Sequence, residues 1–90
     1  MPDVRFTTHL RIHFPTLRDG DVSGSTLAEI VTELDRRHPG LAAYLVDDHG
    51  SLRKHVNMFV NEQLLEDRLR LGDVVGPKDR VFIMQALSGG

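Results

Sequence analysis

The sequence predicts an α+β domain in which one main helix packs across a mixed sheet of four to five strands. Three patterns indicate this class: apolar and polar residues alternate near the N-terminus, a helical apolar repeat follows residue 26, and two strand-like apolar runs occupy the second half. Alternation has the period of a half-buried strand, whereas the helical repeat has the period of an amphipathic helix. A chain of 90 residues suits a single small domain built from such elements.

The first predicted element is a strand near the N-terminus. Apolar or β-branched residues alternate with more polar ones over 4–10, so side chains are expected to point to two faces in turn. The strand ends before Pro15, because proline cannot donate to a ladder. A short second strand is expected within 17–23, although Asp19-Gly20 is also compatible with a turn. The strand boundaries between Ile12 and Ser23 therefore stay open.

The strongest local pattern predicts a helix that begins at Thr26. Thr26 and Glu29 have the spacing of a capping box, in which each side chain accepts a hydrogen bond from a free backbone N–H at the helix start. The apolar residues that follow recur on one helix face; they are Leu27, Ile30, Val31 and Leu34. Pro39-Gly40 ends the helix, and a second, shorter helical turn is expected over 41–46.

Strands of the second half are predicted from their β-branched and aromatic content. Residues 56–60 form one strand, followed by a turn at Asn61-Glu62 and a short return strand at Leu64-Leu65. Residues 67–75 are expected to be an irregular connection. Residues 80–84 are almost continuously apolar, which predicts a last strand in the middle of the sheet, covered on both faces.

The order of these elements predicts a β-grasp (ubiquitin-like) fold. In that arrangement the first and last strands are parallel neighbours and the helix packs across the sheet. We assign residues 1–86 to this domain and residues 87–90 to a flexible C-terminal tail that ends in Gly-Gly.

Composition excludes several chemistries. The chain has no cysteine, so it holds no disulfide, no thiolate zinc site and no cysteine nucleophile. Its formal net charge of −2 indicates neither a nucleic acid nor an anionic membrane as partner. No apolar run approaches the roughly 18 residues of a membrane span. A small domain without cysteine fits a reducing compartment, so a cytoplasmic location is expected.

Histidines and acidic residues give weak indications of a further site. The five histidines are His9, His13, His38, His49 and His55. His9 and His13 are spaced to share one face of a strand, but no carboxylate stands at a recognisable ligand spacing, so no metal is expected. Asp47-Asp48 is expected to be a solvated turn pair, and Ser88 has no nearby base that would make it a nucleophile. The chain is therefore expected to have no catalytic residue of its own.

Four segments, in this order and spacing, form a recognisable pattern. They are 26–31 at the helix start, 34–41 at the helix end, 56–61 with the form VNxxVN, and 79–83 leading to Ser88-Gly89-Gly90. The pattern resembles the ubiquitin-like sulfur-carrier family, which includes the thiamine-biosynthesis carrier ThiS and the molybdopterin-synthase small subunit MoaD. Segment 34–41 is most similar to the carriers of cysteine-biosynthesis type. The resemblance covers nearly the whole chain.

The resemblance implies a sulfur carrier, a protein substrate rather than an enzyme. In that family a partner adenylating (E1-like) enzyme uses ATP to activate the C-terminal carboxylate, here that of Gly90, and a sulfur donor converts it to a thiocarboxylate. A sulfur-accepting synthase in cofactor, amino-acid or secondary-metabolite biosynthesis then receives the sulfur. No cofactor is expected on the carrier itself. Without a Cβ, Gly89 would fit a narrow channel, and Leu87 and Ser88 are expected to enter the partner's active site with it.

A partner-docking sheet face is also implied by the resemblance. Met84, Phe59 and Leu65 are expected on it, with a place in the core as the alternative for each. Basic side chains that could form a polar rim are Arg53, Lys54, Arg68, Arg70 and Arg80.

Several functions share the same chemistry at the C-terminus. One alternative is a ubiquitin-like modifier that is joined through Gly90 to lysines, and another is the small subunit of a molybdopterin-synthase-like complex. A third is a structural subunit with an inert tail. Glu62 and Gln85 stand where many relatives carry Gly and Pro, so the identity of the partner stays open.

Overall fold

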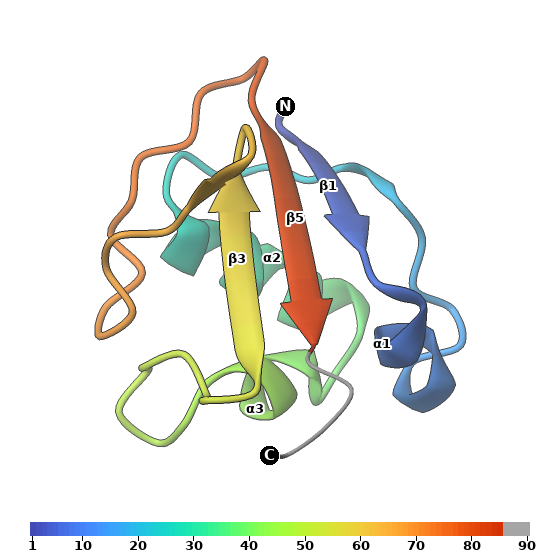
Figure 1. The fold of residues 1–90 in the computed structure, drawn as a ribbon. Helices are drawn as coiled ribbons and strands as arrows, with labels where there is room; N and C mark the ends of the chain where they lie inside the picture. The colour runs from blue at the N-terminus through green and yellow to red at the C-terminus, as the bar shows by residue number, and fades with distance from the viewer. Residues whose placement is uncertain (86–90) are drawn as a thin grey trace.

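Helices cover one face of a mixed β-sheet in this computed structural model, which describes residues 1–85 (Figure 1). The elements are β1 Asp3–Phe6, α1 Thr8–His13, β2 Gly20–Asp21, α2 Leu27–Arg37, α3 Leu41–Leu45, β3 Val56–Val60, β4 Gln63–Leu64 and β5 Arg80–Gln85. The five strands lie in the order β2-β1-β5-β3-β4. This arrangement confirms the predicted β-grasp class. The predicted tail, residues 87–90, lies outside the described residues.

The last strand, β5, occupies the centre of the sheet. It pairs in parallel with β1 on one side, as predicted, and antiparallel with β3 on the other (Figure 1). Its side chains alternate, because Val81 and Ile83 are fully buried under the helices whereas Arg80 and Phe82 are exposed on the opposite face. The prediction that both faces of 80–84 are covered was therefore wrong. An apolar residue on the outward face, Phe82, made the run look like a strand buried on both sides.

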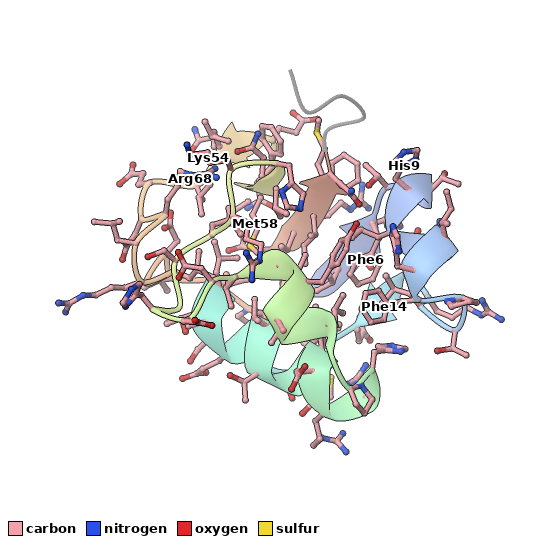
Figure 2. All side chains as sticks on the ribbon, turned by 90° about the horizontal axis from the view of Figure 1, so that it is seen from below. Phe6, His9, Phe14, Lys54, Met58 and Arg68 are labelled. Carbon is pink, nitrogen blue, oxygen red and sulfur yellow. The ribbon has the colours of Figure 1, made fainter. Side chains whose placement is uncertain are left out.

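The core fills the space between the inner face of the sheet and the helices. The predicted apolar face of α2 is buried there, since none of Leu27, Ile30, Val31 and Leu34 is more than 6% exposed. Figure 2 shows Phe6 of β1 and Met58 of β3 in this layer, and both are buried. The core therefore covers one face of the sheet, and the opposite face is open to solvent.

The first strand is shorter than predicted. It ends at Phe6, and the residues expected to continue it form the short helix α1. The alternation predicted a strand over 4–10 because Leu10, which α1 buries, also fits an apolar position of a strand. In the helix Leu10 is the buried residue while Ile12 is exposed, and the Phe14 N–H donates to the Leu10 carbonyl at 3.0 Å. The short strand β2 lies inside the predicted range 17–23.

Thr26 caps helix α2, as predicted, and the helix itself begins at Leu27. The Thr26 Oγ1 accepts a hydrogen bond from the Glu29 N–H at 3.2 Å. In a capping box the Glu29 carboxylate would accept from the N–H of the N-cap residue, here Thr26. Instead it accepts from the N–H and the hydroxyl of Ser25, at 2.8 Å and 2.9 Å. These bonds from Ser25 lower the pKa of Glu29, since they favour its charged form.

The first free N–H groups of α2 are satisfied by the connection that precedes β5. The Leu27 N–H donates to the Asp73 carbonyl at 3.1 Å, and the Ala28 N–H to the Leu71 carbonyl at 2.9 Å. Leu71 and Val75 of this connection are buried, so its irregular backbone is fixed in place. The start of α2 is therefore held both by its own cap and by a distant segment.

A two-residue turn joins β3 to β4. Asn61 and Glu62 have φ angles of 50° and 72°, the left-handed values that such hairpin turns require. The Asn61 side chain donates to the Asp79 carboxylate at 2.7 Å and accepts from the Arg80 N–H at 2.9 Å. The hairpin is thereby tied to the start of β5, and the predicted turn at 61–62 is confirmed.

The cap of α2 gives a test of the fold. Thr26→Ala removes the acceptor for the Glu29 N–H and should lower the free energy of unfolding by about 1 kcal/mol. Thr32→Ala is the matched control, since the Thr32 hydroxyl donates to the Ala28 carbonyl in mid-helix and alanine is the better helix former. Urea unfolding measures both. Equal stability of the two variants would contradict the capping role.

Candidate functional site

The solvent face of the sheet carries an apolar strip. Phe59 of β3 lies directly opposite Phe82 of β5, and Met84 follows two residues further along β5. All three belong to the outward set, because their neighbours Met58, Val81 and Ile83 point into the core. Phe82 is 37% exposed, and Phe59 and Met84 are half-buried. Together Phe59, Phe82 and Met84, here called the apolar strip, line a hollow on this face.

Charged side chains border the apolar strip at the end where β1 begins. The Asp3 carboxylate bridges Arg5 and Arg80, with Oδ2 at 3.1 Å and 3.2 Å from the two Nε atoms. Lys78 and Glu62 line the same hollow. Because Asp3 orients both guanidinium groups without burying them, they remain available to a partner.

The predicted docking residues divide between this face and the core. Phe59 and Met84 lie on the face, but Leu65 is 6% exposed and packs in the core, so its placement on a docking face was wrong. Its N–H donates to the Met58 carbonyl at 2.9 Å, which continues the hairpin and turns Leu65 inward. Phe82 was missed. The outward position of Arg80, two residues earlier in the same strand, is the sequence signal that would have placed it.

Of the basic residues predicted to form a rim, Arg80 lines the hollow. Arg68 instead covers the edge of β3: its Nη1 donates to the Asn57 Oδ1 at 2.6 Å, and its Nη2 to the carbonyls of Arg53 and Val56 at 2.8 Å and 3.0 Å. Figure 2 shows Arg68 next to Lys54, on the opposite side of the molecule from His9. Arg68 thus supports the sheet edge.

Arg53 and the remaining basic candidates, Lys54 and Arg70, lie away from the hollow. The Arg53 Nε donates to the Ala43 carbonyl at 3.0 Å, which joins the segment before β3 to α3. Lys54 and Arg70 are exposed. The predicted rim of five basic residues therefore reduces to Arg80, with Arg5 and Lys78 as members that the sequence did not indicate.

The histidines are spread over the surface. His9 and His13 lie one turn apart on α1, and the His38 Nδ1 is 3.2 Å from the Thr16 hydroxyl. Within residues 1–85 no three histidine or acidic side chains come together as metal ligands. The Asp47 carboxylate accepts from the N–H groups of His49 and Ser51, which lowers the pKa of Asp47 and closes the turn there. Asp47 therefore acts as a turn residue.

The end of β5 is fixed by three different segments. Gln85 lies opposite Val56 of β3. Its N–H donates to the Thr7 Oγ1 at 3.3 Å, and its side-chain Oε1 accepts from the Tyr44 hydroxyl of α3 at 2.9 Å. Gly90, Gly89, Ser88 and Leu87, the residues predicted to carry sulfur or to enter a partner, lie outside the described residues. The contacts of Gln85 therefore fix the last described residue before these four positions.

A β-grasp domain with an apolar strip on its open sheet face and a central last strand is a ubiquitin-like protein in architecture. Residues 8–90 match the sequence model of the ThiS family. The chain therefore belongs to the ThiS family, and the predicted family resemblance is confirmed.

Individual relatives agree with this assignment. The sulfur carrier protein CysO of Mycobacterium tuberculosis is 29% identical over 89 residues, covering 97% of this chain and 96% of CysO. Among solved structures, the BexX/CysO complex of Amycolatopsis orientalis contains a chain that is 29% identical with a TM-score of 0.85, and the match covers 100% of both chains. The small archaeal modifier protein 1 of Methanosarcina acetivorans, 21% identical over 98% of this chain and 94% of its own, shares the fold with a TM-score of 0.75.

Residues 1–85 contain no helix with the length and apolar character needed to cross a membrane.

The placement of Arg68 leads to a stability test. Arg68→Ala removes three hydrogen bonds from a charged donor and should lower the free energy of unfolding by about 2 kcal/mol. Arg70→Ala, an exposed neighbour on the same connection, should stay within about 0.5 kcal/mol of the parent chain. Thermal unfolding followed by circular dichroism compares them. Equal melting temperatures of the two variants would contradict the supporting role of Arg68 at the edge of the sheet.

Proposed function

We propose that this chain is a sulfur carrier whose Gly90 carboxylate accepts sulfur as a thiocarboxylate. The observation that carries the proposal is the ThiS-family match over residues 8–90, which runs through the predicted tail to Gly90. The sulfur carrier protein CysO, similar over almost its whole length, supports the same function. The chain thus serves as a protein substrate, and partner enzymes catalyse the reactions at its Gly90 carboxylate.

The proposed chemistry has two steps at one carbon. The Gly90 carboxylate oxygen attacks the α-phosphorus of ATP on an adenylating enzyme, the bond between the α- and β-phosphates breaks, and pyrophosphate leaves. Sulfide from a donor then attacks the carbonyl carbon of the acyl-adenylate, the bond from that carbon to the adenylate oxygen breaks, and AMP leaves with one of the former carboxylate oxygens. The product is a thiocarboxylate whose sulfur a synthase accepts. ATP is bound by the partner, so the carrier needs no cofactor, and this ATP dependence is consistent with a cytoplasmic reaction.

The architecture supports this division of labour. β5 has paired neighbours on both edges, so the strand that leads to the tail is among the best-held parts of the chain. About five residues of extended chain reach roughly 17 Å. A partner that binds the body of the domain is therefore within reach of Gly90.

Docking is proposed to use the apolar strip and its charged border. The strip of Phe59, Phe82 and Met84 lies on β3 and β5, the strand that continues into the tail. A complementary partner presents an apolar patch that covers the two phenylalanines and acidic groups opposite Arg5 and Arg80. The same partner can then hold the body and act on the carboxylate.

Activation is tested directly by intact mass. The protein is incubated with the adenylating enzyme of its source organism, ATP and a sulfide donor, and we expect a gain equal to the difference between sulfur and oxygen. A chain that lacks Gly89-Gly90 is the control and should show neither this gain nor release of pyrophosphate. If an enzyme that is competent on another carrier leaves the full chain unchanged, the proposed function is wrong.

Docking through the apolar strip is tested by a charge on the sheet face. Phe82→Asp should raise the KM for carrier activation about tenfold or more, because a charge in a desolvated contact removes a central anchor. Leu69→Asp is the matched control, since Leu69 is also an exposed apolar residue, 73% exposed, but lies on the connection before β5 and does not line the hollow. Both variants should retain the parent's circular dichroism spectrum. An equal effect of the two substitutions on KM would contradict docking through the apolar strip.

A further inference from the structure

The end of β5 carries a polar side chain where the sheet pattern calls for an apolar one. Val81 and Ile83 point to the helices, so Gln85, two residues further, lies on that same inner side. A half-buried amide needs a hydrogen-bond partner, because leaving it unpaired costs more than an apolar residue would. The Tyr44 hydroxyl supplies that partner at 2.9 Å. Packing alone does not require this pair, since an aliphatic residue would fill the position.

The Tyr44 ring is itself held in place. Its centroid lies 5.0 Å from that of His13, 5.7 Å from that of Phe14 and 6.0 Å from that of His55. The first two rings come from the end of α1 and the third from the segment before β3. Tyr44 has few rotatable bonds and is packed from several sides, so its hydroxyl is presented to Gln85 at little entropic cost.

Gln85 is consequently restrained through both its backbone and its side chain. The backbone N–H donates to the Thr7 Oγ1, and the Thr7 N–H in turn donates to the Ile83 carbonyl at 3.2 Å. The side chain is held by α3 through Tyr44. Terminal strand residues ordinarily fray, because one more residue's backbone freedom costs about 1–2 kcal/mol to remove. Here two side chains from other elements oppose that fraying.

We infer that Tyr44 is a positioning residue for the reactive terminus: its hydroxyl, by holding Gln85, sets the point and direction in which the chain leaves the sheet toward a partner enzyme. The inference rests on the proposed function, because positioning matters only if the terminus reacts in a partner's active site. A terminus that starts from a fixed point loses less freedom on entering that site, so the reacting geometry is reached more often. Tyr44 and Gln85 are together called the exit clamp.

The clamp is tested with variants that remove one atom group each. Tyr44→Phe keeps the ring and its aromatic neighbours and deletes the hydroxyl. Gln85→Met keeps the size of the side chain and deletes the acceptor. Gln85→Glu retains an acceptor for the Tyr44 hydroxyl and is the conservative variant. Thr26→Ala, with a comparable loss of stability at the remote start of α2, is the control for general destabilisation.

We expect Tyr44→Phe and Gln85→Met each to lower kcat for adenylation about three- to tenfold with KM unchanged, because docking through the apolar strip is intact. The double variant should lose no more than either single one, since both remove the same bond. Gln85→Glu and Thr26→Ala should keep the parent's kcat. Equal kcat for Tyr44→Phe and Thr26→Ala, or losses that multiply in the double variant, would overturn the inference.

A second measurement needs no partner. The ¹⁵N heteronuclear NOE of the Gln85 amide reports fast motion at the end of β5 and should fall in Tyr44→Phe while that of Ile83 stays high. An unchanged NOE at Gln85 overturns the clamp. If the parent chain itself is never adenylated, the proposed function fails instead, and the NOE alone then decides whether Tyr44 orders the end of the strand.

Discussion

Pairing of β5 on both edges is the constraint on which the rest of the structure depends. A parallel neighbour, β1, and an antiparallel one, β3, bring the last strand into the middle of the sheet. Because β1 and β5 are parallel, the chain between them has to cross over one face of the sheet, and α2 packs on that face (Figure 1). The core, the open sheet face and the exit of the chain all follow from this placement.

The same alternation along β5 separates two tasks. Val81 and Ile83 bind the sheet to the helices, whereas Phe82 and Met84 are left on the solvent side. Apolar side chains on an exposed face contribute little to folding, so their presence next to the charged Asp3–Arg5–Arg80 group is better explained by contact with a partner. For the proposed carrier function this placement matters, because Phe82 and Met84 lie on β5, the strand that precedes the predicted reactive end.

Sequence reasoning predicted the fold where local and global signals agreed. Helix α2 has a cap, an apolar face and a proline-glycine end, and each points to the same element. The error at α1 arose because a single buried residue, Leu10, fits both the apolar pattern of a strand and that of a short helix. The error about β5 has a different cause, because a run of apolar residues does not show which of their side chains are exposed to solvent.

The sequence did not predict contacts between residues that are far apart along the chain. Arg68 was expected at a surface rim, but its carbonyl acceptors at Arg53 and Val56 are 15 and 12 residues away. The bond between Tyr44 and Gln85 joins residues 41 positions apart, and no local pattern indicates it. Leu65 was misplaced because the hairpin pairing that puts Leu64 opposite the outward Phe59, and so turns Leu65 to the inner face, is not visible in the sequence. Gly90 itself was singled out by resemblance, and its role as the reactive end remains a prediction.

The central claim is that Gly90 carries sulfur in the cell, and the composition of the chain permits a clean measurement. Because there is no cysteine, a thiol-alkylating reagent has no cysteine thiol to modify, and a thiocarboxylate would be the reactive sulfur nucleophile. Protein isolated from its source organism is alkylated, digested with trypsin and analysed by mass spectrometry, with the C-terminal peptide 81–90 released after Arg80. The account predicts an alkylated thiocarboxylate on that peptide. A peptide that always ends in an unmodified carboxylate, with residues 81–90 joined through Gly90 to lysines of other proteins, would contradict it and indicate a modifier.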